Sequence, residues 1–503
     1  MVFLLGREKK KGGEKIINSM PDLKTETLHG VKWSAIGRFA NTAISFGFGI
    51  VLARVLSPSD FGVMGMIAIF FAIAGIFIDS GFGTALVQKK TVTDEDMSTM
   101  FYFNVGMALF FYILLFFSSP WIAEFLDTPI LKDIIRVTGL SMVIGALGGV
   151  QYNMLTRQVN FKVPAIISLI CNLSSGCVGI IMAYKGLGVW ALVVQGLLST
   201  IVNVVCVWLY SSWRPVPKFS VASFKEMASF GGNLTFNAIL DKIYNEGTGF
   251  LIGKFYKPAQ LGYYTKGQGT ASMPSTFLSD VVSGVLLPVL SKIQDDDDAL
   301  LRAYSKFMRI MSLVIFFGIM LLVALARPLT IFLYSDKWIP AIIFVQIFCM
   351  RYMFYHINRV NWDLLLVKKR TDLCLKKEMV NKIFNFGFLA IAIPFGVQAI
   401  AWAGVAASVF NILVNTYVTG KVFPYGFKSQ FMDFMPYLVK AAIACAPVYL
   451  LSSSDILSPF LTLMVGSIGS VLIYGSYLYL TKDENFFTLV QLTPLKKYIT
   501  IKQ

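Results

Sequence analysis

Charge, histidine and paired cysteines are scarce in this sequence of 503 residues. Only 14% of the residues are charged, whereas a soluble domain commonly carries about 25%. The two histidines, His29 and His356, are too few for a His-rich metal site or a conventional Ser-His-Asp triad. The six cysteines show neither CxxC nor Cys/His ligand spacing, so no metal site or disulfide framework is indicated.

Apolar residues dominate the chain instead. They make up 56% of it, and the mean hydropathy is +0.67, so the protein is expected to lie in a lipid bilayer. The N-terminus is apolar first and turns basic only from Arg7 to Lys15, which is the reverse of a secretory signal peptide. Cleavage is therefore not expected, and Met20, just before a basic lead into the first apolar segment, is an alternative start.

The length of the apolar segments predicts an all-α membrane protein with about fourteen transmembrane helices, because a bilayer core of about 30 Å needs roughly 20 helical residues. The predicted spans are 31–54, 61–87, 98–119, 133–154, 163–183, 188–210, 224–253, 261–289, 304–325, 338–358, 378–395, 398–418, 434–452 and 459–480. The weakest are 224–253 and 261–289. They carry Asp241, Lys242, Glu246, Lys266 and Asp280.

Lysine and arginine are distributed unequally between the two sides of these spans. With the N-terminus in the cytoplasm, 30 of them lie in or beside cytoplasmic segments and 8 in or beside external ones. The positive-inside rule therefore predicts a bacterial cytoplasmic (inner) membrane protein with both termini in the cytoplasm. This bias explains much of the net charge of +16, and no basic patch outside the spans is interleaved with aromatics, so nucleic acid is not expected as a partner. The Asp295–Asp298 run is interpreted as a solvated loop and not as a metal site.

Two segments 200 residues apart share a pattern. The run GIVLARVLSPSDFG ends the first predicted span at 49–62, and GFLIGKFYKPAQLG ends the seventh at 249–262. In this register Gly49, Arg54, Pro58 and Gly62 face Gly249, Lys254, Pro258 and Gly262. A weaker echo at an offset of about 210 sets Arg157 against Lys368 and Gly186 against Gly396.

The repeat implies two halves of six spans each. Since six is even, both halves start on the same side and are predicted to be parallel bundles related by a pseudo-twofold axis along the membrane normal. The predicted domains are a cytoplasmic N-terminal extension (1–30), an N-terminal bundle (31–222), a C-terminal bundle (223–425), two additional transmembrane helices (426–482) and a cytoplasmic tail (483–503). Rocking of one bundle against the other around a central cavity is the mechanism that this symmetry favours.

Three motifs resemble a known family. They are LARVLSPSDFG at 52–62, DSGFGTALVQ at 79–88 and RQVNFK at 157–162. They are similar to segments of the polysaccharide transporter family, in the branch that exports lipopolysaccharide, colanic acid and teichuronic acid. That family lies in the multidrug/oligosaccharidyl-lipid/polysaccharide flippase superfamily. The resemblance implies a flippase, not an enzyme, that moves an undecaprenyl-pyrophosphate-linked oligosaccharide repeat unit to the outer leaflet by alternating access. Its implied partners are the lipid-linked oligosaccharide, membrane lipid and other polysaccharide-assembly proteins.

A lipid-linked diphosphate needs fixed positive charge in a wet cavity. Basic residues within predicted spans are therefore the candidate substrate-binding groups. They are Arg38, Lys242, Lys266, Arg351 and Arg359. A charge at the centre of a lone helix costs about 2.5 to 3.5 kcal/mol on insertion, so each should face the bundle interior. Snorkelling to the headgroups is the alternative for Arg38 and Arg359, which are nearer the helix ends.

Acidic and amide residues predict coupling to Na⁺ or H⁺, with no other cofactor. Asp241 is expected to join the oxygens of Asn381 and Asn385, one turn apart on the eleventh span, to hold Na⁺ or pass a proton. A buried structural network is the alternative. Asp241 and the adjacent Lys242 point about 100° apart and are not expected to pair. Asp79, near the cytoplasmic end of the second span, is interpreted as an interhelical cap or salt bridge.

Two other functions remain as alternatives. A drug or metabolite antiporter on the same fold would want acidic groups in a smaller, apolar cavity, whereas the basic excess inside the spans favours an anionic substrate. A membrane polysaccharide polymerase or glycosyltransferase would need a large external loop or domain with a catalytic acid. The longest external loop predicted here, around 118–133, is short.

Overall fold

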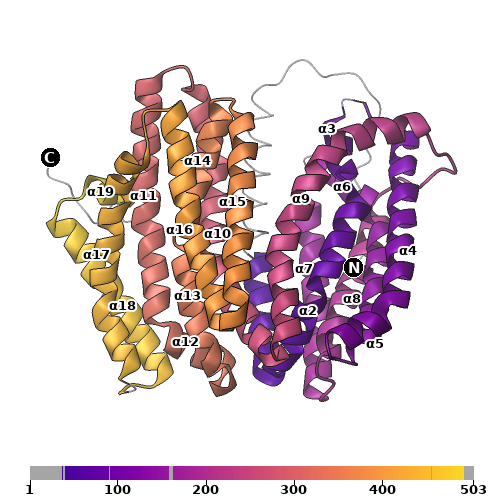
Figure 1. Ribbon diagram of the computed structural model, residues 1–503, viewed down its shortest axis with the longest axis horizontal. Coiled ribbons are helices and arrows are strands. Elements are labelled where there is room, and N and C mark those ends of the chain that lie inside the picture. The colour runs from indigo at the N-terminus through magenta and orange to yellow at the C-terminus, as the bar shows by residue number, and fades with distance from the viewer. Residues whose placement is uncertain (1–36, 38–39, 90, 158–161, 455, 492–503) are drawn as a thin grey trace.

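The computed structural model describes residues 37, 40–89, 91–157, 162–454 and 456–491, and for 230–238 and 277–289 it describes the backbone alone. These residues form helices and turns, with no strand among them. Figure 1 shows two groups of helices standing side by side. After a first helix, Ala40–Val55, one group contains α2 (Pro58–Asp79), α3 (Phe82–Gln88), α4 (Asp94–Phe125), α5 (Leu131–Ala146), α6 (Gly149–Arg157), α7 (Lys162–Tyr184), α8 (Trp190–Tyr210) and α9 (Val221–Phe255). The other contains α10 (Pro258–Lys292), α11 (Asp297–Ala324), α12 (Ala326–Tyr334), η2 (Asp336–Ala341), α13 (Ile342–Tyr352), α14 (Tyr355–Val367), α15 (Thr371–Ala392), η3 (Ile393–Phe395), α16 (Val397–Val422), α17 (Phe427–Ser453), α18 (Pro459–Leu480) and α19 (Glu484–Gln491).

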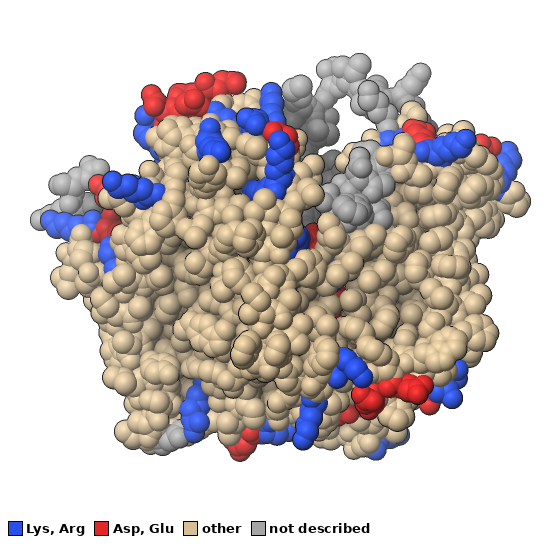
Figure 2. Space-filling view, in the orientation of Figure 1, with Lys and Arg blue, Asp and Glu red and all other residues tan. Residues whose placement is uncertain are grey.

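The surface carries the signature of a multi-pass membrane protein. Within the described part of the chain, ten helical segments are long and apolar enough to cross a membrane, or eleven if α5 and α6, bent by 46°, form one span. Figure 2 shows the charged side chains gathered at the two ends of the molecule, with a broad uncharged belt between them. α9 and α10, the spans that the sequence predicts to be weakest, are helices of 35 residues each that fall outside these ten.

Three predicted spans are divided by turns, and in the one over 338–358 Met353 and Phe354 separate α13 from α14. The span predicted over 133–154 is split into α5 and α6, and the one over 61–87 is split into α2 and α3 at Gly81, whose φ of 72° is left-handed. The carboxylate of Asp79, at the end of α2, lies against the backbone N–H groups of Gly83 and Gly81. It therefore satisfies free donors at the start of α3, which confirms its interpretation as a cap.

α2 and α10 cross in direct contact near their first turns. Pro58 begins α2 and Pro258 begins α10, as their equivalent places in the repeat predict. A Cβ atom on Gly62 would overlap the carbonyl oxygen of Pro258, and one on Gly262 would overlap that of Pro58. Only glycine lets the two backbones approach this closely, so the contact explains why both halves carry glycine at this place.

The helices that precede α2 and α10 each contact the other half of the chain through a basic residue at their end. Arg54, at the end of the first helix, donates a hydrogen bond of 2.8 Å from Nε to the carbonyl of Leu333 at the end of α12. Lys254, at the end of α9, forms an ion pair of 3.1 Å with Asp127 after α4. Figure 1 shows α9 beside α2, although α9 belongs to the second half of the sequence. The ends of both helices are therefore fastened to the other half.

The weaker echo of the repeat also has counterparts in the structure. Arg157 Nη1 donates to a backbone carbonyl at the end of α3 at 2.8 Å, and Lys368 Nζ donates to a carbonyl just after α10 at 3.0 Å. Gly186 and Gly396, which precede α8 and α16, have φ values of 77° and 101°. Both glycines therefore occupy turns that a side chain would strain.

The last two long helices extend the second group. Asp433 of α17 accepts a hydrogen bond from Ser305 of α11 at 2.5 Å and pairs with Arg309 of the same helix at 2.7 Å. Asn361 of α14 and Gln430 of α17 exchange amide hydrogen bonds of 2.8 and 2.9 Å. Because both partners of the amide pair are buried, these contacts hold α17 firmly in place.

Candidate functional site

A cavity of about 460 Å³ lies between the first helix and α10. Its volume is in the range of sites that bind small molecules or parts of larger ones. Hydroxyl and amide groups, aromatic rings and an ammonium group line it. The lining side chains are Asn41, Thr42, Ser45 and Phe46 of the first helix, Thr265, Lys266, Thr270 and Met273 of α10, and Tyr334 of α12.

Lys266 supplies the positive charge of this cavity. Its Nζ donates a hydrogen bond of 3.2 Å to the carbonyl oxygen of Gly49. Three aromatic rings surround the ammonium, with centroids at 4.3 Å for Tyr334, 5.2 Å for Phe61 and 5.8 Å for Trp338. Within the described part of the chain, no carboxylate lies within ion-pair distance of it. The ammonium is therefore held by weak partners and is available to an anion.

The repeat does not duplicate this charge. In the register of the two halves the counterpart of Lys266 is Met66, which is fully buried and packs against Gly253 of α9. The helix crossing is thus common to both halves, whereas the cationic cavity belongs to one side.

Arg351 of α13 lies on a different face of α10. Its guanidinium is next to the hydroxyl of Tyr264, and it lies over the ring of Tyr352 with the centroid at 5.5 Å. Gln268 of α10 donates to the Tyr352 hydroxyl at 3.1 Å. Tyr264 and Gln268 are one turn apart, and Lys266 lies between them in sequence on the opposite side of the helix. α10 therefore separates Arg351 from the Lys266 cavity in this conformation.

The remaining predicted substrate-binding residues do not line this cavity. Arg38 lies outside the described residues. Lys242 pairs with Glu246 at 3.7 Å, and Arg359 pairs with Asp363 at 3.7 Å, each one turn along its own helix. These i,i+4 pairs compensate the charge of both basic residues locally. The substrate-binding roles of all five basic residues stay predictions.

The predicted ion-coupling residues divide into two places. Asp241 of α9 forms an ion pair with Lys382 of α15. Asn381 lies on a different side of α15, toward α16, where its amide is 3.5 Å from Oδ1 of Asn415. Oδ1 of Asn381 and Oδ1 of Asn385 are buried and have no hydrogen-bond partner in the described structure. The joint ion site of Asp241 with the two asparagines stays a prediction.

Comparison with known proteins places the chain in a family. The polysaccharide biosynthesis protein family matches residues 51–343, which is more than half of the sequence. The chain belongs to this family. The matched region includes the α2–α10 crossing, Lys266 and much of the cavity wall.

Two relatives and one solved structure match most of the chain. The teichuronic acid biosynthesis protein TuaB of Bacillus subtilis (strain 168) is 24% identical over 428 residues, covering 84% of this chain and 89% of the relative. The lipopolysaccharide biosynthesis protein WzxC of Escherichia coli (strain K12) is 24% identical over 405 residues, covering 78% and 80%. The lipid II flippase MurJ, in an inward closed conformation, superposes with a TM-score of 0.73 at 16% identity and covers 89% of this chain and 98% of its own. The likeness to MurJ shows a shared fold.

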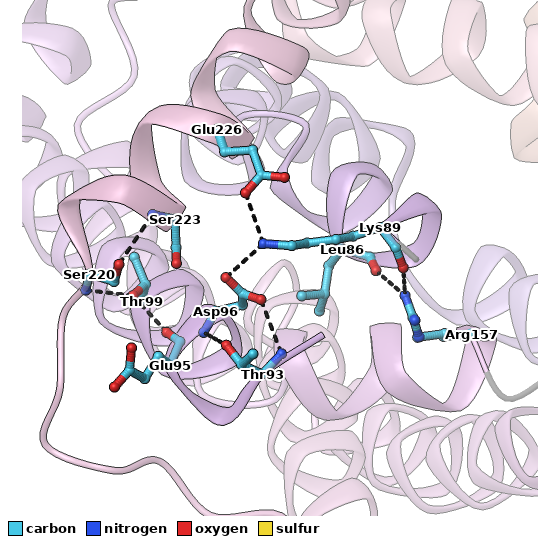
Figure 3. A network of polar contacts seen from close by, with 10 residues as sticks. All are labelled: Leu86, Lys89, Thr93, Glu95, Asp96, Thr99, Arg157, Ser220, Ser223 and Glu226. Carbon is cyan, nitrogen blue, oxygen red and sulfur yellow. Dashed lines mark hydrogen bonds and ion pairs between the residues drawn. The ribbon is translucent and has the colours of Figure 1, made fainter. Parts of the chain in front are cut away.

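A polar network joins α3, α4 and α9 at one end of the first helix group. Figure 3 shows Lys89 between two carboxylates, with Asp96 of α4 at 3.0 Å and Glu226 of α9 at 2.9 Å. The hydrogen bond to Glu226, together with Asp96, raises the pKa of Lys89 above its usual value. The backbone N–H of Ser220, which caps α9, donates to Oγ1 of Thr99 at 2.9 Å. The start of α9 is therefore fastened to α4 and to the residue that follows α3.

Several of these functional groups were not predicted. Lys382 lies inside the predicted span 378–395 and could have been found there as a charge within a span. The tyrosines around Arg351 and the small polar side chains of the first helix give no sequence signal that distinguishes them from other polar residues in spans.

Proposed function

We propose that this polysaccharide biosynthesis protein is a flippase that moves an undecaprenyl-pyrophosphate-linked oligosaccharide repeat unit across the bacterial cytoplasmic membrane. The observation that carries the proposal is the Lys266 ammonium, which lacks an anionic partner among the described residues and stands in the wall of the 460 Å³ cavity. A cation in such a place would bind a diphosphate. Hydroxyl, amide and aromatic groups beside it, such as Ser45, Asn41 and Tyr334, suit sugar rings.

The names of the relatives support the same substrate class. TuaB and WzxC are named for the biosynthesis of teichuronic acid and lipopolysaccharide, and MurJ is named as a flippase of lipid II. A transporter, and not an enzyme, is the function that these names favour. An antiporter of cationic drugs fits less well, because the cavity presents an ammonium and no carboxylate among its lining residues.

The proposed architecture has fourteen spans. It counts the ten apolar segments, the bent pair α5 and α6, the first helix, α9 and α10. Two parallel six-helix bundles, related by a pseudo-twofold axis, would be followed by α17 and α18, with both termini in the cytoplasm. The reciprocal contacts of Gly62 with Pro258 and of Gly262 with Pro58 support this symmetry. Alternating access would then be the rocking of one bundle against the other.

We also propose that transport is coupled to a cation, H⁺ or Na⁺, through the buried face of α15. The unpartnered oxygens of Asn381 and Asn385 support this role. Buried polar atoms without partners are costly, so they are retained where they serve a ligand or water.

Deletion of the gene tests the function directly. Lipid-linked oligosaccharide should accumulate on the cytoplasmic side and surface polysaccharide should be lost, as measured by mass spectrometry of lipid extracts and by staining of the cell surface. Complementation with the Lys266→Met variant should restore little export at normal protein level. Lys257→Met, at the exposed N-cap of the same helix, is the matched control and should complement fully. Unchanged lipid-linked sugars in the deletion strain would remove the proposal.

A further inference from the structure

A buried lysine stands at the cytoplasmic end of α15. Lys377 is 2% exposed and lies six residues after Thr371, where the helix begins. Its ammonium is 5.0 Å from the ring centroid of Trp362 in α14. It makes no hydrogen bond or ion pair with any described residue. A buried ammonium held by one aromatic ring is costly in its charged form, so the site offers Lys377 little compensation for its charge.

The same face of α15 continues inward as a line of amides. Lys377, Asn381 and Asn385 are spaced by four residues, so they lie one above another about 6 Å apart. Across from them Asn415 of α16 donates to Oδ1 of Asn358 in α14 at 2.7 Å. Oδ1 atoms of Asn381, Asn385 and Asn411 have no partner among the described residues. The three helices, adjacent in Figure 1, therefore enclose a polar track that leads from Lys377 toward the middle of the membrane.

The charges around this track disfavour a metal cation. The carboxylate of Asp241 is already paired with the Lys382 ammonium, and the Lys377 ammonium lies one turn from Asn381. A Na⁺ ion among the amides would thus stand near two ammonium groups, and the amides themselves carry no negative charge to offset them. Repulsion between like charges in a buried site is strong. A proton needs no set of oxygen ligands around it, because it moves along hydrogen-bonded groups and water. It requires only one side chain that binds and releases it.

Few other titratable side chains lie close to Lys377. On α15 itself Cys374 and Glu378 are the neighbours of Lys377. From α14, Asp363 is paired with Arg359, and from α9, Asp241 is paired with Lys382. The buried residues of α16 include no titratable side chain, and η3 carries none. Lys377 is therefore the group on this face whose protonation can change with least interference.

We propose that Lys377 is the proton-carrying group of the transport cycle. This inference rests on the proposed flippase function and assigns its coupling ion as H⁺. In one conformation the Lys377 ammonium gives its proton to water on the cytoplasmic side and becomes a neutral amine. In the other conformation the amine takes up a proton that arrives along the amide track, which restores the ammonium. Lys377 releases one proton to the cytoplasm and takes up one from the other side, so no further reactant is needed. One proton therefore enters the cell in each cycle.

The test uses the full-length protein in proteoliposomes with the lipid-linked oligosaccharide extracted from the deletion strain. Flipping is measured with an imposed pH gradient, an imposed Na⁺ gradient or neither. A gradient of one pH unit biases a one-proton equilibrium by about tenfold, so a clear acceleration is expected for the wild type and no response to Na⁺. Lys377→Gln and Lys377→Arg should both lose the response of the flipping rate to the pH gradient. Lys376→Gln, an exposed neighbour on the same helix, should respond as the wild type does.

The outcomes separate the two proposals. No flipping by the wild type would refute the flippase function itself. Flipping that responds to Na⁺, or a Lys377→Gln variant that keeps the full pH response, would refute the role of Lys377 alone. A purely structural lysine predicts that the cationic Lys377→Arg variant is rescued, so a normal pH response in that variant would also overturn the inference.

Discussion

Gly62 and Gly262 each lie against the carbonyl group of the proline that begins the other's helix. The two contacts are reciprocal, and they place the crossing of α2 and α10 at the same turn of both halves. A side chain at either position would have to push the partner backbone away.

The first prediction concerns this crossing. Gly62→Ala should destabilise the protein by about 1 to 3 kcal/mol, because the added methyl group meets backbone atoms that cannot move aside. Thermal unfolding in detergent measures the effect. Gly75→Ala is the matched control on α2, since a Cβ atom there meets nothing within 4 Å, and it should be neutral or slightly stabilising. Equal stability of both variants would contradict the reciprocal contact.

Arg351 and Arg38 are expected to serve transport. Arg351→Ala removes a charge-assisted contact worth about 1.5 to 3 kcal/mol, so it should sharply reduce polysaccharide export. Arg351→Lys keeps the charge but loses the fork that faces Tyr264, and partial activity is expected. Export is quantified against protein level by immunoblotting. Wild-type export by the Arg38→Ala, Arg351→Ala double variant would show that neither arginine binds the diphosphate.

Asp241 should contribute little to stability and more to transport. Its pair with Lys382 is half-exposed, and such pairs are worth no more than about 1 kcal/mol, so Asp241→Asn should unfold at nearly the wild-type temperature. If Asp241 takes part in coupling, the same variant should flip lipid at a rate that no longer responds to the ion gradient. Glu246→Gln, which breaks the neighbouring pair with Lys242, is the control. A variant that loses stability but keeps its gradient response would assign a structural role.

The orientation can be tested with single cysteines. In a cysteine-free background, a cysteine at Asp296 should react with a membrane-impermeant maleimide only after the cells are opened, because the basic bias places this turn in the cytoplasm. A cysteine at Lys185, in the turn before α8, should react in intact cells. Labelling of the Asp296 position from outside would invert the proposed topology.

The sequence predicts the positions of the membrane spans better than the contacts between them. Apolar runs are long and continuous, so they identify most spans, and the Pro and Gly positions of the repeat predict where α2 and α10 begin and touch. Lys266 could be predicted as a cavity residue because a charge within a span must avoid lipid. The break between α5 and α6 could not, since it depends on how the surrounding helices pack.

The sequence does not predict which side chains of neighbouring helices contact one another in the site. The sequence predicts that Asp241 faces Asn381 and Asn385, but the side chain that reaches it is Lys382. The rotation of α15 about its axis decides which of these neighbours in sequence faces α9, and that rotation follows from packing against α14 and α16. Arg38 lies outside the described residues, so its place stays a prediction.

The contacts of Arg54 and Lys254 with the opposite half leave the chain almost no slack. Only Leu56 and Ser57 connect the first helix to α2, and only Tyr256 and Lys257 connect α9 to α10. Two residues of extended backbone span roughly 7 Å, which is too short to let the joined helices drift apart. A change of tilt between the halves must therefore be absorbed as backbone rotation at these two dipeptides. The two dipeptides would act as paired hinges. A change in the tilt of one half would then require backbone rotation at both hinges and a matching change in the other half.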